Sequence, residues 1–215
     1  MRIVIPTHAS EIKLHEYQQY VKVVESNPNV SQFLKHKTIE IFCHVPLKVS
    51  AQMTKRNVDD IYNVIMKTID TDIVQFQQRF DFVGKEFGFI PDFENMTSGE
   101  YMDLSEYIKS WDTMHKAMAV LFRPIVLKKG SKYLIDDYTG SETWSSVMLN
   151  LPLDKALGAV FFLTSSFKQL SRDTLQYLKE QAENNQEFNR SLSKSGVGTT
   201  QFISALEATS SVLTR

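Results

Sequence analysis

The chain has 215 residues, of which 42% are hydrophobic and 23% charged, and its formal net charge at pH 7 is −1. These values are typical of a globular protein with one substantial core, and they argue against wholesale disorder. The near-neutral charge excludes a global attraction to nucleic acid or to an anionic membrane, so a contact with DNA would need a local basic patch.

The single cysteine, Cys43, rules out an intramolecular disulfide and a cysteine-based zinc site, and it favours folding in a reducing cytosol. The N-terminal segment holds one short apolar run that ends at Pro6, too short for a signal peptide. No apolar run approaches the roughly 20 residues that a membrane-spanning helix needs. We therefore expect a protein that is made in a cytoplasm and has no membrane partner.

The first third of the chain predicts a short strand followed by three helices. Polarity alternates over Arg2–Ile5 and the run ends at Pro6, which favours an edge strand. Apolar residues at helical spacing then predict helices over 14–24, from Ser31 toward His44, and from an N-cap at Thr54 to Ile69.

The hydrophobic period changes to two between residues 79 and 91, which predicts a β-hairpin joined near Gly84. Its aromatic rings exceed what an isolated hairpin can bury, so it docks on the chain's own core, the default, or on a neighbouring subunit. The hypothesis of a neighbour makes three residues of this hairpin candidate interface residues: Phe82, Phe87 and Phe89.

Further helices are predicted on both sides of a second hairpin. Thr97 and Glu100 have the spacing of a capping box and open one helix. Asp112 is predicted to cap the next helix, which ends before Pro124. The second hairpin is predicted over residues 125–135, around Lys129-Gly130-Ser131.

A long helix with an apolar stripe is predicted from Pro152 to about Asn184. We expect the helices within 97–122 and 152–183 to form the main core. The large residues predicted to be buried there are Trp111, Leu121, Leu157, Phe161 and Leu175.

The last segment, 189–215, differs in composition, since ten of its 27 residues are Ser or Thr. Such a segment cannot pack a core by itself, and Gly196 and Gly198 make it a flexible spacer. We predict an extended tail that binds a partner subunit, with candidate interface residues Phe202, Ile203, Leu206 and Leu213. The expected fold is thus mainly α: a helical bundle over 1–188 with one or two inserted hairpins, near 79–91 and 125–135, and an extended C-terminal tail.

The sequence predicts no catalytic, cofactor or metal site. Cys43 and His44 are neighbours on a helix, where successive side chains point about 100° apart and cannot form a catalytic dyad. The histidines share no metal-ligand spacing, and the glycines form no phosphate-binding loop. An enzyme is therefore the least favoured class.

Two polar segments have a functional and a plainer interpretation. Asp136-Asp137 can ligate a hard cation, but calcium loops need more alternating oxygen ligands, so a turn after a strand is favoured. The lysines of the second hairpin, Lys128, Lys129 and Lys132, can touch phosphates, but a solvated turn is commoner. Neither segment supports sequence-specific binding of nucleic acid.

Four segments resemble a family of structural-module proteins of tailed bacteriophages, including proteins of crAss-like and other Bacteroidetes phages. The main one is GFIPDFENMTSGEYMDL at 88–104. The others are IKLHEYQ at 12–18, HKAMAVLFRPI at 115–125 and Tyr138-Thr139-Gly140. The resemblance covers most of residues 1–188, and no enzymatic activity attaches to it.

The resemblance implies a virion structural protein, a ring or connector component at the portal, neck or tail. Its partners would be copies of itself in a ring-like homo-oligomer and other portal, neck or tail proteins. It would be located in the virion after synthesis in the bacterial host cytoplasm. The alternatives are a tail assembly chaperone that stays outside the particle and, less favoured, a DNA-contacting protein carried in the head.

Overall fold

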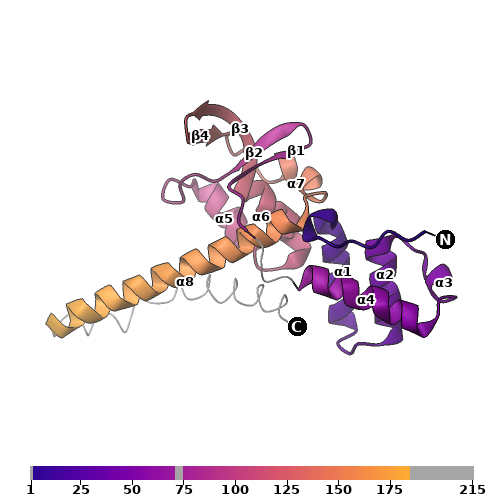
Figure 1. The fold of residues 1–215 in the computed structure, drawn as a ribbon. Helices are drawn as coiled ribbons and strands as arrows, with labels where there is room; N and C mark the ends of the chain where they lie inside the picture. The colour runs from indigo at the N-terminus through magenta and orange to yellow at the C-terminus, as the bar shows by residue number, and fades with distance from the viewer. Residues whose placement is uncertain (1, 71–74, 185–215) are drawn as a thin grey trace.

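A computed structural model describes the backbone of residues 2–70 and 75–184 (Figure 1). In these ranges the chain forms eight α-helices, two short 3-10 helices and one antiparallel sheet with strand order β1-β2-β3-β4. The fold is therefore mainly helical with a small sheet. The predicted tail, 189–215, lies outside the described residues.

Four helices make one end of the molecule, which we call the helical lobe: α1 (Leu14–Ser26), α2 (Gln32–Cys43), α3 (Leu47–Ser50) and α4 (Lys55–Ile69). Local capping explains where two of them begin. The Ser31 hydroxyl accepts a hydrogen bond from the Leu34 N–H, and the Thr54 hydroxyl accepts one from the Asn57 N–H. The three predicted helices of this region are confirmed.

The predicted strand at Arg2–Ile5 is wrong, because these residues form no strand. Ile3 and Ile5 are partly buried against the core, and the segment is held to α4 where the Thr68 hydroxyl donates to the Pro6 carbonyl at 3.1 Å. The alternating pattern therefore arises because one side of this irregular segment packs on helices while the other side is exposed.

The other end, the sheet lobe, combines the sheet with three helices. Its strands are β1 (Arg79–Phe82), β2 (Lys85–Phe89), β3 (Phe122–Lys129) and β4 (Lys132–Ile135). Its helices are α5 (Ser98–Tyr107), α6 (Met114–Leu121) and α7 (Glu142–Met148). Both predicted hairpins are confirmed, and antiparallel pairing of β2 with β3 joins them into one sheet.

The predicted cap at Asp112 is wrong. A 3-10 helix, Trp111–Thr113, precedes α6, and its N-cap is Ser110, whose hydroxyl accepts from the Asp112 N–H. The chain passes from α6 directly into β3, so Pro124 lies within a strand and is paired with Phe87.

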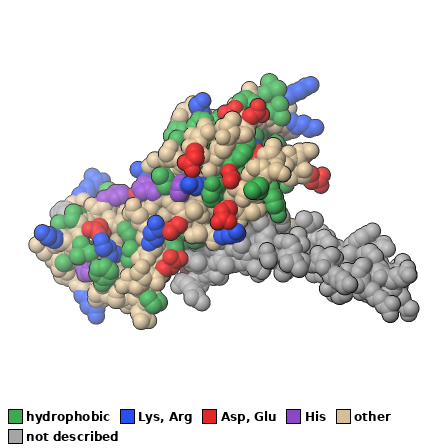
Figure 2. Space-filling view, turned by 180° about the vertical axis from the view of Figure 1, so that it is seen from behind, with side chains coloured by type: hydrophobic (Ala, Val, Ile, Leu, Met, Phe, Trp, Pro, Cys, Tyr) green, Lys and Arg blue, Asp and Glu red, His purple; other side chains and the backbone are tan. Residues whose placement is uncertain are grey.

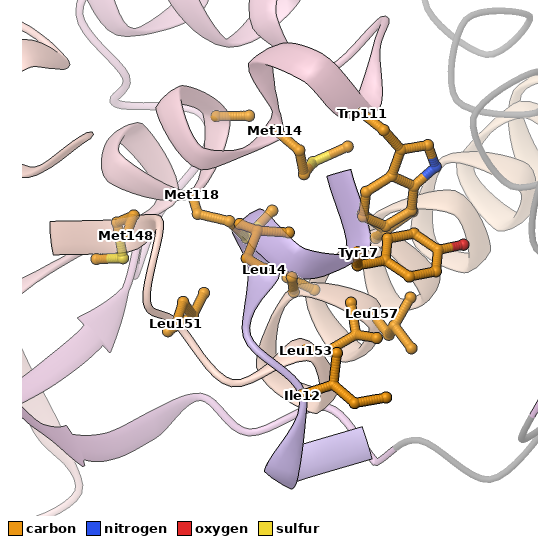
Figure 3. Packing of buried hydrophobic residues seen from close by; sticks show 14 of the residues in the cluster. Ile12, Leu14, Tyr17, Trp111, Met114, Met118, Met148, Leu151, Leu153 and Leu157 are labelled. Carbon is orange, nitrogen blue, oxygen red and sulfur yellow. The ribbon is translucent and has the colours of Figure 1, made fainter. Parts of the chain in front are cut away.

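The last helix, α8 (Leu153–Asn184), begins in the core and then extends away from both lobes (Figure 1). Its start is fixed to the N-terminal segment, because the Leu14 N–H donates to the Leu151 carbonyl and the Leu153 N–H donates to the Ile12 carbonyl. Figure 3 shows residues of α1, α6 and α8 meeting in this core, where the Tyr17 and Trp111 ring centroids lie 4.7 Å apart.

The predicted core residues are confirmed in large part. Trp111, Leu121 and Leu157 are buried. Phe161 is only partly buried, since it lies beside the buried stripe of α8 that contains Val160. Leu175 falls among side chains that the structure leaves undescribed. Within the described ranges, no helix is both long and apolar enough to cross a membrane.

Candidate functional site

The aromatic hairpin β1–β2 packs on the chain's own core. Phe87 and Phe89 are fully buried, and the Phe89 ring lies edge-on to Phe122 with centroids 5.1 Å apart. Phe82 is partly buried and packs edge-on against Phe87. The default interpretation of this hairpin is therefore the one observed. The assignment of Phe87 and Phe89 to an interface is not kept, because a partner cannot reach them in this conformation.

Three of the four segments singled out in the sequence, 88–104, 115–125 and 138–140, meet at one place, between α5, the start of β3 and the loop before α7. We call it the motif cluster and define it by Thr97, Glu100, Asp103, Arg123 and Tyr138. It begins with local structure, because Thr97 and Glu100 form the predicted capping box. The Thr97 hydroxyl accepts from the Glu100 N–H, and one Glu100 carboxylate oxygen accepts from the Thr97 N–H at 2.7 Å.

The other Glu100 oxygen accepts a hydrogen bond from the Arg123 guanidinium, and both side chains are only 7% exposed. Burial of the Glu100 carboxyl opposes its ionisation, but hydrogen bonds from Thr97 and the charge of Arg123 outweigh burial and lower its pKa. The pair therefore stays ionised at neutral pH and fastens α5 to the sheet.

Tyr138 closes the cluster. Its ring lies 5.4 Å from the Arg123 guanidinium, and its hydroxyl donates to the Asp103 carboxylate. Burial first, and this hydrogen bond second, raise the pKa of Tyr138, so its hydroxyl remains a neutral donor. These contacts connect residues that are 23 and 35 positions apart in the chain.

The hydrogen bonds of the motif cluster join three separate segments of the chain. Its two carboxylates accept hydrogen bonds from protein groups, and it contains no thiol and no histidine.

Comparison with known proteins found no matching family model, no matching curated protein and no matching solved structure.

The histidines gather elsewhere, on the helical lobe and toward its junction with the rest of the molecule (Figure 2). A hollow of about 490 Å³ between α1 and α2 is lined in part by His15, Glu16, Glu40 and His44. His44 ends α2 in the left-handed region with φ of 54°, and its Nε2 lies 3.2 Å from the Glu16 carboxylate. Nothing in this arrangement supplies a nucleophile.

The structure also places two segments for which the sequence favoured a plain interpretation over a site: Cys43 and Asp136-Asp137. Burial raises the pKa of the Cys43 thiol to about 11, which makes it a poor nucleophile at neutral pH. Asp136 and Asp137 follow β4 in an exposed irregular segment, where the Asp136 carboxylate accepts from the Asp137 N–H. In the described part of the chain, no group of three or more His, Cys, Asp or Glu side chains is arranged to hold a metal ion.

The second hairpin, β3–β4, is the part of the sheet lobe that reaches farthest from the other elements (Figure 1). Its aliphatic residues Val126, Leu127 and Leu134 are 56 to 61% exposed. Leu127 is paired with Leu134, and Lys129 is paired with Lys132. Both pairs lie on one side of the hairpin because side chains alternate along a strand.

We call Val126, Leu127, Lys129, Lys132 and Leu134 the hairpin surface. Val126 is the extra residue of an irregularity in the pairing between Ile125 and Leu127, so it does not follow the alternation. Lys128 is not part of the hairpin surface, since it points to the other side and pairs with the Glu86 carboxylate. The sequence singled out the lysines of this hairpin but not its exposed aliphatic residues. The signal was present in the apolar run Ile125–Leu127, but only the structure shows that nothing in the described chain covers Val126 and Leu127.

Proposed function

We propose that this protein is a structural component of a tailed-phage virion, a ring or connector subunit of the portal, neck or tail assembly, without enzymatic activity. The observation that carries the proposal is the motif cluster. The residues that resemble the phage family form a helix cap and a buried ion pair, which fix the shape of the sheet lobe. A subunit whose role is assembly depends on such a fixed shape and needs no reactive group.

The exposed elements agree with this proposal. A hairpin with uncovered aliphatic residues and a helix that extends beyond both lobes offer contacts to neighbouring subunits. The segment 189–215, which follows that helix, is proposed to bind a neighbour through Phe202, Ile203, Leu206 and Leu213. Copies of this chain and other portal, neck or tail proteins are the proposed partners, and the virion is the proposed location.

The test is quantitative mass spectrometry on purified particles of the phage that encodes the chain, with the host lysate measured in parallel. A fixed copy number per particle, comparable to that of known ring proteins in the same sample, is expected. Presence in the lysate with absence from particles would replace the proposal with a tail assembly chaperone. Salt-sensitive association with the packaged DNA, and not with the portal or tail, would favour the DNA-contacting alternative.

A further inference from the structure

Two features of the hairpin surface are energetically unfavourable when the surface faces only water. Three aliphatic side chains are more than half exposed within nine residues. Lys129 and Lys132 lie directly opposite each other, and like charges in that position repel. Residues 125–135 contain no acidic side chain to offset them. An apolar partner surface that carries negative charge would relieve both features.

The exposed side of α5 has the complementary character. Tyr101 and Met102 are 59% and 68% exposed, and the Glu106 side chain is 71% exposed. Met102 and Glu106 are four positions apart and so share one face of the helix, with Tyr101 beside them. Asp92 and Glu94 are also exposed in the loop before α5. Three acidic side chains of residues 92–109 are exposed: Asp92, Glu94 and Glu106. Glu106 also forms an exposed ion pair with Lys109, whereas Glu100 is buried with Arg123 and does not contribute to this face.

We propose that the hairpin surface of one copy of this chain binds the exposed α5 face of a second copy, which we call the α5 surface: Glu94, Tyr101, Met102 and Glu106. In this contact the Leu127–Leu134 pair covers Tyr101 and Met102, and the opposed Lys129 and Lys132 lie in the negative field of the exposed glutamates, Glu94 and Glu106. Figure 2 shows hydrophobic and basic side chains at the projecting end of the sheet lobe, with acidic side chains beside them and over the rest of the lobe. Charge complementarity between the two surfaces selects this pairing.

Other occupants fit the hairpin surface less well. Pairing of two hairpin surfaces would place four lysines in one contact without an acidic side chain to offset them. Duplex DNA would neutralise the lysines but would leave the three aliphatic side chains without an apolar partner. If the hairpin surface faced only water, its aliphatic side chains would stay exposed and the repulsion between Lys129 and Lys132 would stay uncompensated.

The inference rests on the proposed function in one respect, because a ring requires a contact between copies of the chain. The contact is small, since about five side chains on each copy bury less than the ~1,600 Å² of a standard interface. Association of the purified protein is therefore expected to depend on concentration and to weaken as salt rises. Repetition of the contact around a closed ring would strengthen it by avidity.

The experiment measures self-association of the full-length chain by sedimentation velocity over a concentration series at low and high salt. K129E/K132E changes the hairpin surface and E94K/E106K changes the α5 surface. Each is expected to weaken association by about tenfold or more, because it places like charges across the contact. The two double variants mixed together are expected to associate through a restored contact. K48E/K55E, with the same charge change at exposed positions of the helical lobe, is the matched control and is expected to associate like the parent.

Thermal unfolding of each variant, with the same midpoint as the parent, establishes that folding is intact. The inference is overturned if the parent chain stays monomeric at every concentration, or if it associates and neither surface variant weakens it. It is also overturned if K48E/K55E weakens association as much, or if the mixture of the two variants stays monomeric. Binding of a duplex DNA probe that K129E/K132E abolishes, without self-association, would assign the hairpin to nucleic acid. Self-association through these surfaces in a protein that is absent from virions would refute the proposed function and leave the inference standing.

Discussion

The buried ion pair of the motif cluster permits a sharp test of what holds the sheet lobe together. Glu100→Gln removes the negative charge but keeps a side chain that can still cap α5, because glutamine serves at this position of a capping box as well as glutamate. The change therefore isolates the ion pair from the helix cap. Arg123 stays buried, with a positive charge that its former partner no longer neutralises.

Removal of one partner of a buried ion pair costs about 3 to 5 kcal/mol, mostly because the remaining charge is left without compensation. The amide introduced by Glu100→Gln retains one acceptor for Arg123, so we expect a loss near the lower end, about 3 kcal/mol. For a chain of this size such a loss lowers the melting temperature by roughly 6 to 12 °C. The double variant E100Q/R123M is expected to be more stable than E100Q, since it contains no uncompensated buried charge.

The assay is urea and thermal unfolding followed by circular dichroism. Glu106→Gln is the matched control, because it breaks an exposed ion pair with Lys109 on the same helix, and such pairs contribute little. Thr97→Ala removes only the cap and is expected to cost about 1 kcal/mol. Equal melting temperatures for E100Q and E106Q, or an E100Q/R123M variant no more stable than E100Q, would refute this role of the ion pair.

Three further predictions concern other parts of the molecule. Gly88→Ala should destabilise the fold by about 1 to 3 kcal/mol in urea unfolding, since the added Cβ would lie 2.4 Å from the Tyr133 ring; an unchanged midpoint would contradict it. Burial, and then the charge of Lys116, lower the pKa of His115 below 6.5. The contribution of neutral His115 to stability should therefore be full above pH 6.5 and decline as the pH falls from there toward the folded-state pKa. His115→Gln should reduce this pH dependence in urea unfolding, and an unaltered dependence would count against the prediction. Deletion of residues 189–215 should leave a folded protein by circular dichroism that fails to join particles in a complementation assay, and either unfolding or normal incorporation would disprove the assigned role of that segment.

The sequence by itself determined the features that depend on neighbouring residues. The caps at Thr54 and Thr97 were predicted because each hydroxyl reaches a backbone N–H three positions later, and Ser31 caps the helix predicted from that residue in the same way. The two hairpins were predictable because a period-two pattern and a glycine turn lie within one short segment. The alternating pattern at Arg2–Ile5 failed as a predictor, because packing against helices satisfies it as well as a sheet does.

Only the tertiary structure decided what brings distant segments together. Pairing of β2 with β3 and the ion pair of Glu100 with Arg123 link residues that no local pattern connects, since the sequence does not encode which of many polar groups will meet. The exposure of Leu127 and Leu134 was likewise hidden, because an apolar strand residue has the same sequence signature whether its own core covers it or a partner does. For this reason the sequence predicted the elements of the hairpin surface but not the surface itself.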